Sequence, residues 1–307
     1  MSTAPTVPEA PPAARGRRRQ PYRWTGVWFV TPFLAVFAFV FIGPLAYAVY
    51  LSLFQTQLIG GTSFVGLENY LAVLQDENFW DGAARVSLFL LVQVPFMLLI
   101  SVTAAMILDS ARIRGIRFFR ISLFLPYAVP GVAAVLIWGF IYGERFGLAG
   151  NVNDALGADI VTPLSPEWLL VAIGNIVTWS FAGYNMLILY SALKTVPTEL
   201  YEAAALDGAS AFRIIWHIKL PAVRGALVIA VIFSIIGSFQ LFNEPSVLQT
   251  IVPNLISTHY TPNMYAYNLS FVGQQTNIAA ALSIIMGVIT AAIAYAVQLR
   301  GNREALR

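Results

Sequence analysis

The chain of 307 residues is 58% hydrophobic and only 11% charged, with a formal net charge of +3. A soluble protein of this size needs more polar surface, and a mean hydropathy of +0.71 is typical of a membrane protein. The absence of cysteine excludes disulfides, thiolate metal sites and a lipid-modified cysteine within these residues.

The first 26 residues are rich in Pro, Ala and Arg, and we expect them to form a disordered, basic cytoplasmic tail. The run Arg17, Arg18, Arg19 also fits the start of a twin-arginine export signal. The apolar segment that follows is too long for such a signal and has no evident small-residue cleavage site. We therefore favour a retained membrane anchor.

Six apolar windows without charged residues follow, each close to the roughly 20 residues that cross a bilayer as a helix. They predict an all-α membrane protein with six transmembrane helices in one domain over residues 27–299. The windows lie at about residues 27–53, 86–108, 121–142, 168–193, 225–243 and 278–299.

The Lys and Arg residues fall almost entirely on one side of this predicted topology. They precede the first window, lie between the second and third and between the fourth and fifth, and follow the sixth; only Arg85 and Arg145 lie in the other connections. Cationic flanks are retained on the cytoplasmic side. Both termini, including residues 300–307, are thus expected to be cytoplasmic, and the positive charge indicates membrane orientation rather than a nucleic-acid partner.

The polar connection at about residues 195–221 carries a spaced pattern. It has Glu-Ala-Ala, three residues, Gly, nine residues, Ile, one residue and Leu-Pro. Pro197 suits the first turn of a helix, Gly208 accepts the left-handed conformation of a corner, and Ser210 can cap a second short helix. The segment therefore predicts a helix, a tight corner and another helix. An ordinary amphipathic loop on the bilayer surface is the alternative.

This spacing resembles the cytoplasmic coupling loop of ABC importer permeases. In that family the loop docks into a cleft on a separate ATPase subunit and passes its closing motion to the membrane helices. The resemblance assigns ATPase coupling to Glu202, Ala203, Ala204, Asp207, Gly208, Ile218, Leu220 and Pro221.

The sequence offers no energy source of its own. Lys194 and Lys219 are the only lysines, and neither follows Gly as a phosphate-binding loop requires, so ATP and Mg are expected in the partner ATPase. The only histidines, His217 and His259, lie outside the apolar windows, which disfavours a proton-driven transporter, a histidine metal site and an intramembrane hydrolase. We expect a transport subunit without cofactors, not an enzyme.

Further motifs resemble the carbohydrate-uptake, maltose-type branch of the family. They are Phe-Val-Gly-Leu-Glu-Asn-Tyr at 64–70, Leu-Pro-Tyr-Ala-Val-Pro at 125–130 and Val-Pro-Thr-Glu-Leu-Tyr at 196–201. The resemblance implies a type I importer of a di- or oligosaccharide in a bacterial or archaeal cell membrane. It also implies a second homologous permease, two copies of a cytoplasmic ATPase and an extracytoplasmic sugar-binding protein.

Two other functions compete with sugar import. An importer of another polar solute, such as a glycerol phosphate ester, would share the coupling loop, but phosphate would favour Arg or Lys near the site and none lies in a window. A membrane receptor or scaffold could also have six helices, although it would have no reason to carry the coupling pattern.

The resemblance to the maltose transporter also implies a substrate pathway on the third, fourth and fifth helices. Aromatic faces there would pack on sugar rings and polar groups would bind hydroxyls. The implied residues are Tyr127, Gly131, Ser180, Phe181, Tyr184, Gly237, Gln240, Leu241 and Glu244, with Val177 at a further matching position. Ordinary helix packing is the alternative for each of them.

Some of these positions depart from the family pattern. Val177, Leu241 and Glu244 replace the polar or amide residues expected there, which implies a different sugar or a different pose. Pro245 predicts a helix break directly after Glu244, so Glu244 is either a substrate or gate contact or a solvated helix end.

The charge distribution gives a topology that can be tested. Reporters fused after residue 210 or at the C-terminus should show cytoplasmic activity, whereas fusions near residues 70, 155 and 260 should show external activity. External activity at residue 210 would contradict both the orientation and the coupling assignment.

Overall fold

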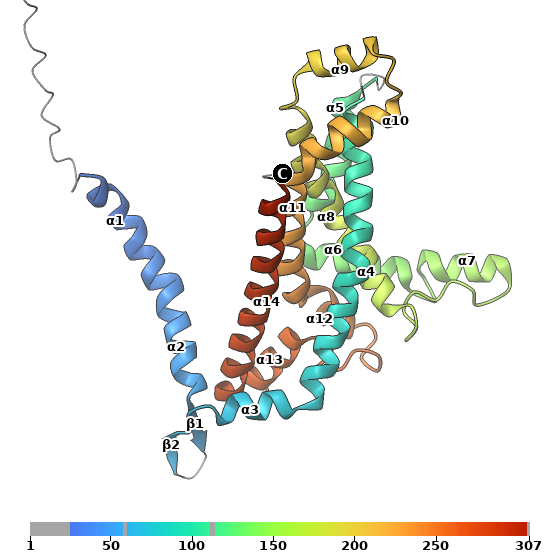
Figure 1. Ribbon diagram of the computed structural model, residues 1–307. Coiled ribbons are helices and arrows are strands. Elements are labelled where there is room, and N and C mark those ends of the chain that lie inside the picture. Colours follow the sequence, from blue (N-terminus) through green and yellow to red (C-terminus); the bar gives the residue numbers. More distant parts are fainter. Residues whose placement is uncertain (1–24, 58–59, 111–113, 306–307) are drawn as a thin grey trace, which may run out of the picture. The chain divides into compact units, whose positions relative to one another are not determined.

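The computed structural model describes residues 25–57, 60–110 and 114–305, and nearly all of them are helical (Figure 1). The expected basic tail, apart from its last two residues, lies outside this range. The chain divides into two units, residues 1–47 and 48–307, which are treated separately below.

The first apolar window forms one long helix, as predicted. It consists of α1 (Thr25–Phe37), a π-helical turn η1 (Ala38–Ile42) and α2 (Gly43–Ser52). Its apolar side chains are exposed on all sides within their unit, and Phe33, Phe37 and Phe41 stack at four-residue spacing. A helix that is apolar all round is suited to a membrane rather than to water.

The larger unit begins with the last turn of α2, which is followed by a small hairpin of β1 (Phe54–Gln57) and β2 (Gly61–Phe64) in antiparallel register. Asn69 donates to the carbonyl oxygens of Ser52 and Phe54 at 2.8 Å, and Asn277 accepts from the amide of Thr56 at 3.3 Å. These amides fix the hairpin to the helices that follow. The Phe64-to-Tyr70 motif thus has a structural role here.

The remaining elements are helices. In chain order they are α3 (Glu68–Gln75), α4 (Glu77–Leu108), α5 (Ile116–Phe124), η2 (Leu125–Ala128), α6 (Gly131–Tyr142), α7 (Leu148–Leu156), α8 (Leu169–Leu193), α9 (Thr198–Leu206), α10 (Ala211–Ile214), η3 (Ile215–Lys219), α11 (Leu220–Phe239), α12 (Asn243–Gln249), α13 (Pro262–Phe271) and α14 (Thr276–Ala305).

Five helical segments in the described residues are long and apolar enough to cross a membrane, and a bent pair brings the number to six. These agree with the six predicted windows, although α14 continues to Ala305, beyond the predicted end of the sixth window. The prediction of one uninterrupted helix over 121–142 is wrong. Here α5 and η2 meet α6 at an angle of 97°.

Proline chemistry explains the bend. Pro130 has no amide hydrogen and disfavours a helical conformation in the preceding residue, and Val129 accordingly has an extended ψ of 129°. Prolines also follow both π-helical turns. Gly43 and Leu220, each directly before a proline, donate to a carbonyl five residues back rather than four.

The core of the larger unit is centred on α4 and α8, which pack along each other and against α11. Phe89 of α4 and Ile173 and Ile176 of α8 are almost completely buried there. Ser101 of α4 donates to the carbonyl of Ala182 in α8 at 2.9 Å. Buried polar groups in a membrane helix thus find partners on the neighbouring helix.

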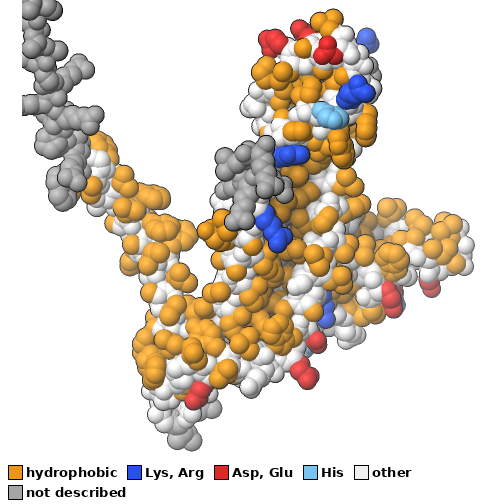
Figure 2. All heavy atoms as spheres, in the orientation of Figure 1, with side chains coloured by type: hydrophobic (Ala, Val, Ile, Leu, Met, Phe, Trp, Pro, Cys, Tyr) orange, Lys and Arg blue, Asp and Glu red, His pale blue; other side chains and the backbone are white. Residues whose placement is uncertain are grey.

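Two of the outer connections lie at the end of this unit opposite to the inner connections, whereas α7, in the remaining outer connection, projects from its side (Figure 1). Figure 1 shows α3 and α13 at one end, with α9, α10 and the C-terminal end of α14 toward the other. In Figure 2, apolar side chains cover most of the visible face, and most of the Lys and Arg lie toward the α9–α10 end. This arrangement is consistent with the predicted topology.

The outer end contains its own polar contacts. Arg85 donates to the carbonyl of Tyr260 at 2.7 Å and lies over the ring of the same residue. Asp76 accepts a hydrogen bond from Tyr265, whose pKa is raised to about 12 by burial and by this carboxylate. These contacts connect α4 to the segment around α13.

Gly183 gives a stability prediction, because a Cβ at this position would collide with the carbonyl oxygen of Leu123 where α8 meets α5. Gly183→Ala must push the two backbones apart. We expect a loss of about 1–3 kcal/mol or more, measured as a lower thermal-unfolding temperature in detergent. Gly225→Ala is the matched control, since a Cβ there meets nothing within 4 Å. Equal stability of the two variants would contradict the packing.

Candidate functional site: a coupling segment and a membrane cavity

The predicted coupling segment, at about residues 195–221, has the predicted local structure at its start. Pro197 precedes α9, Gly208 turns the chain with a φ of +75°, and Ser210 caps α10 by accepting from the amide of Arg213. Gly208 is therefore at a position that other residues occupy only with strain. The helix, corner and second helix are confirmed.

The end of the segment differs from the prediction. The second helix was expected to be short, but α10, η3 and α11 form one continuous helix from Ala211 to Phe239. Ile218 lies in the π-helical turn, and Leu220 and Pro221 lie in the first turn of α11. Pro221 does not end the helix because the wider turn before it accommodates the missing amide hydrogen.

This end of the molecule exposes apolar side chains together with the predicted coupling residues. Glu202, Ala203, Asp207 and Gly208 are exposed, and Ala204 is half-buried. Beside them are the exposed side chains of Leu206, Phe212 and Trp216, and the last two are stacked with ring centroids 6.0 Å apart. The surface thus combines apolar anchors with a sharp corner.

Behind this surface lies an ion cluster that the sequence analysis did not identify. Asp109, directly after α4, binds Lys194 at the end of α8 at 2.9 Å and Lys219 of η3 at 2.7 Å. The Asp109 side chain is only 5% exposed. A carboxylate at a helix C-terminus is opposed by the helix dipole, and two ammonium groups offset this cost.

The cluster also contacts α9. The ammonium of Lys219 lies 5.4 Å from the ring centre of Tyr201, and that of Lys194 lies 5.0 Å from the ring centre of Tyr190. Hydrogen bonding to Asp109 raises the pKa of Lys194, so this group stays cationic. The cluster therefore joins the inner ends of α4 and α8 to both helices of the coupling segment.

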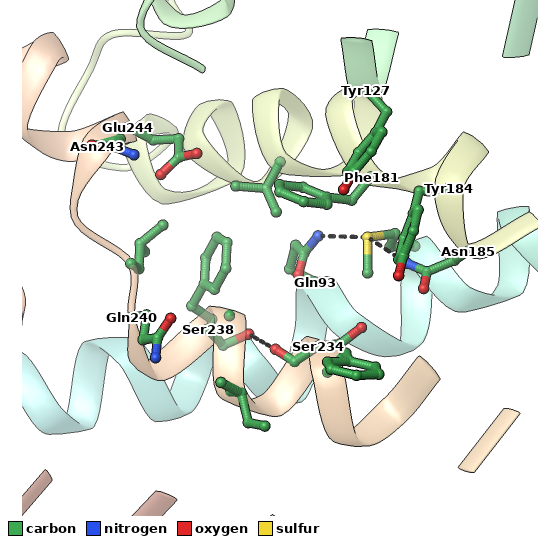
Figure 3. A pocket seen from close by; sticks show the side chains of 17 residues that line it. Gln93, Tyr127, Phe181, Tyr184, Asn185, Ser234, Ser238, Gln240, Asn243 and Glu244 are labelled. Atoms are coloured by element: carbon green, nitrogen blue, oxygen red, sulfur yellow. Dashed lines mark hydrogen bonds between the residues drawn. The ribbon is translucent and has the colours of Figure 1, made fainter. Parts of the chain in front are cut away.

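A cavity of about 420 Å³ lies between α4, α8, α11 and the α5–η2 segment. It brings together most of the predicted pathway residues, and Figure 3 shows several of them with the polar side chains around them. The predicted residues that line it are Tyr127, Val177, Phe181, Tyr184, Gly237, Gln240, Leu241 and Glu244. Gly131 and Ser180 do not line it.

Aromatic rings form one wall of the cavity. The rings of Tyr127 and Tyr184 are stacked with centroids 4.7 Å apart, and Phe181 packs edge-on against Tyr127 at 5.8 Å. Neither tyrosine hydroxyl forms a hydrogen bond with the residues that the structure describes. The rings are thus held by each other, while both hydroxyls remain available to a ligand.

The cavity also contains polar residues that were not predicted. They are Gln93 of α4, Asn185 of α8, Ser234 and Ser238 of α11 and Asn243 of α12. No family motif covers α4, so the resemblance gave no reason to select Gln93. It is the only side-chain amide in the charge-free window 86–108, and this was a signal that could have identified it.

The helix break near Glu244 lies elsewhere than predicted. The chain leaves the helix at Gln240 and resumes it at Asn243, and Pro245 lies within the first turn of α12. Proline is tolerated there because the first amides of a helix have no intrahelical partner. Glu244 is consequently the second residue of α12, half-buried beside the cavity, and it does not belong to the end of α11.

The ion cluster gives a graded stability prediction. Asp109→Asn leaves Lys219, whose side chain is 11% exposed, without its counter-charge, and breaking a buried pair in this way costs about 3–5 kcal/mol. Lys194→Gln is the control, because that side chain is 53% exposed and such pairs contribute about 0–1 kcal/mol. Thermal unfolding in detergent should separate the two variants clearly. Equal losses would show that the cluster is not a buried unit.

Comparisons with known proteins agree with this architecture. A bacterial ABC transporter involved in the import of the acidic polysaccharide alginate has a chain with a TM-score of 0.75 at 17% identity, covering 91% of this chain and 96% of that one. The inward-facing methionine transporter MetNI gives 0.52 at 16% identity, covering 78% and 97%. At these identities the likeness concerns the fold.

Proteins found by sequence comparison have higher identity to this chain than these structures do. The diacetylchitobiose uptake system permease protein NgcF of Streptomyces coelicolor is 31% identical over 94% of this chain and 88% of its own. The sulfoquinovosyl glycerol transport system permease protein SmoG of Agrobacterium fabrum is 29% identical over 91% and 90%. Residues 114–303 match the family of binding-protein-dependent transport system inner membrane components. The chain belongs to this family.

Proposed function

We propose that this chain is the permease subunit of an ATP-driven, binding-protein-dependent importer of a di- or oligosaccharide. The observation that carries the proposal is that one continuous helix, Ala211–Phe239, connects the coupling segment to the cavity wall at Ser234 and Gly237. A displacement at the docking surface would therefore act directly on the substrate pathway.

The family of binding-protein-dependent transport systems supports the partners proposed here. The exposed corner at Gly208, with Phe212 and Trp216 beside it, is suited to docking in a cleft of a cytoplasmic ATPase, where ATP and Mg would bind. A second homologous permease would complete the pathway, and an extracytoplasmic binding protein would deliver the sugar. This chain would alternate between outward-open and inward-open states and perform no covalent chemistry.

The cavity supports a sugar as the substrate class. Stacked tyrosine rings present apolar faces to pyranose rings, and hydroxyl and amide groups surround them. No Lys, Arg or His lines the cavity in the described part of the chain, which argues against a glycerol phosphate ester. The relatives are named for substrates from diacetylchitobiose to alginate, so relationship alone leaves the charge of the sugar open.

The pathway assignment predicts separate losses at the two tyrosines. A neutral hydrogen bond contributes about 0.5–1.5 kcal/mol net and loss of ring packing adds to this, so Tyr184→Ala should lower uptake at limiting sugar about tenfold or more. Tyr184→Phe should cost less, because the stacked ring remains. The measurement is the uptake of radiolabelled sugar by cells that carry equal membrane levels of each transporter variant. Unchanged uptake by both Tyr127→Ala and Tyr184→Ala would make these residues packing elements.

The corner at Gly208 predicts uncoupling. Gly208→Val places a β-branched residue at positive φ, which costs roughly 1–3 kcal/mol and distorts the docking surface. We expect normal membrane insertion, with loss of either ATPase binding or ATP-coupled uptake. Gly208→Asn is the matched variant, because Asn tolerates the left-handed conformation. Uptake retained by Asn and lost by Val supports a conformational role, whereas full uptake by Val removes the docking argument.

A further inference from the structure

The charge of the cavity is set by a single side chain. Among the described lining residues, Glu244 is the only ionisable group besides the two tyrosines, and it is half-buried. It forms no ion pair within the part of the chain that the structure describes, where the only pairs are those of Asp109. Within the described lining, Glu244, with no cation beside it, is the only carboxyl group that can place a negative charge in the cavity, at the end where α12 begins.

The amides at the other end of the cavity present acceptors as well. Met97 accepts from the amide nitrogen of Gln93 at 3.5 Å and from that of Asn185 at 3.7 Å. Gln93 also directs this nitrogen to the hydroxyl of Thr178 at 3.2 Å. A thioether cannot donate, so Met97 orients both amides with their nitrogens toward the sulfur.

This orientation leaves two carbonyl oxygens without partners. Gln93 and Asn185 are 6% and 3% exposed, and their side-chain oxygens accept no hydrogen bond from the described residues. Ser238, by contrast, already donates its hydroxyl to the carbonyl of Ser234 at 2.8 Å. Gln93 and Asn185 line the cavity, so a ligand or water there can donate to these oxygens.

We propose that this cavity selects a sugar that is rich in hydrogen-bond donors and carries no negative charge, and that Glu244 is the residue that excludes carboxylated, sulfated and phosphorylated sugars. The inference rests on the proposed transport function and names its substrate class. Hydroxyl and ammonium groups can donate to Glu244, Gln93 and Asn185. An anionic group would instead be repelled in an environment where charges interact more strongly than in water.

The binding protein has its own preference among sugars. Charge selection by the cavity is therefore tested with ratios of uptake rates between sugars and not with single rates. The complete transporter, with both permeases, the ATPases and the binding protein, is reconstituted in liposomes. The probes are lactose, maltose and diacetylchitobiose; for the sugar taken up best, its aldonic acid and its 1-amino-1-deoxy derivative are added. Each uptake rate is measured with the binding protein saturated by that probe, after its affinity has been determined by calorimetry.

We expect wild-type transporter to import the aldonic acid about tenfold or more slowly than the neutral sugar, and the amino derivative at least as fast. Glu244→Gln should lower uptake of the neutral sugar severalfold, because the amide is a weaker acceptor than the carboxylate. In this variant the uptake rates of the acid and the neutral sugar should differ by no more than about threefold. Glu244→Lys should favour the acid. Glu144→Gln, which removes an exposed carboxylate away from the cavity, is the control and should leave the ratio unchanged.

The failures can be told apart. If no neutral sugar is imported, the proposed sugar transport is wrong. If neutral sugar is imported but the aldonic acid enters equally fast, or if Glu244→Gln leaves the wild-type ratio intact, charge selection by Glu244 is overturned while sugar import stands.

Discussion

Every backbone amide and carbonyl group inside a bilayer needs a partner, because lipid offers none, and this constraint organises the molecule. It favours long uninterrupted helices such as α4 and α8 and confines breaks to protein-lined places. Two breaks, at Val129–Pro130 and at Gln240–Phe242, adjoin the same cavity. Freed backbone groups there can meet protein or water rather than lipid. The interruptions that place Tyr127 and Glu244 beside the cavity are thus located where a membrane protein tolerates them.

The same constraint explains how the inner end is connected to the cavity. The segment Ala211–Phe239 stays helical across Pro221 because a π-helical turn accommodates the missing donor. The buried Asp109 then joins the base of this helix to α4 and α8 through charge pairs. A rigid helix with a fixed base can transmit displacement over its length. Ser234 and Gly237, near its other end, line the cavity together with Glu244, Gln93 and Asn185.

Much of the fold and part of the site could be predicted from the sequence. The membrane helices could be predicted because their windows lack charged residues. The corner could be predicted because Gly208 accepts the left-handed conformation and Ser210 favours a helix N-cap position. The 97° bend was missed because apolarity reports length and not continuity, although Pro130 was a local signal. The ion cluster and the orientation of Gln93 could not be predicted, since Asp109, Lys194 and Lys219 come together only through tertiary packing.

The central claim is that the cavity beside the two helix breaks is the sugar pathway. The sequence contains no cysteine, so each single-cysteine variant reports one position of this chain. Ser234→Cys lies on the cavity wall, whereas Leu91→Cys on α4 is 69% exposed and outside the cavity. We predict that a membrane-impermeant thiol reagent modifies Ser234→Cys in inside-out vesicles of the ATP-free, inward-open transporter, that transported sugar slows this reaction, and that Leu91→Cys, which lies in the apolar stretch of α4 outside the cavity, is unreactive. An unreactive Ser234→Cys, or modification that sugar does not slow, would contradict the account.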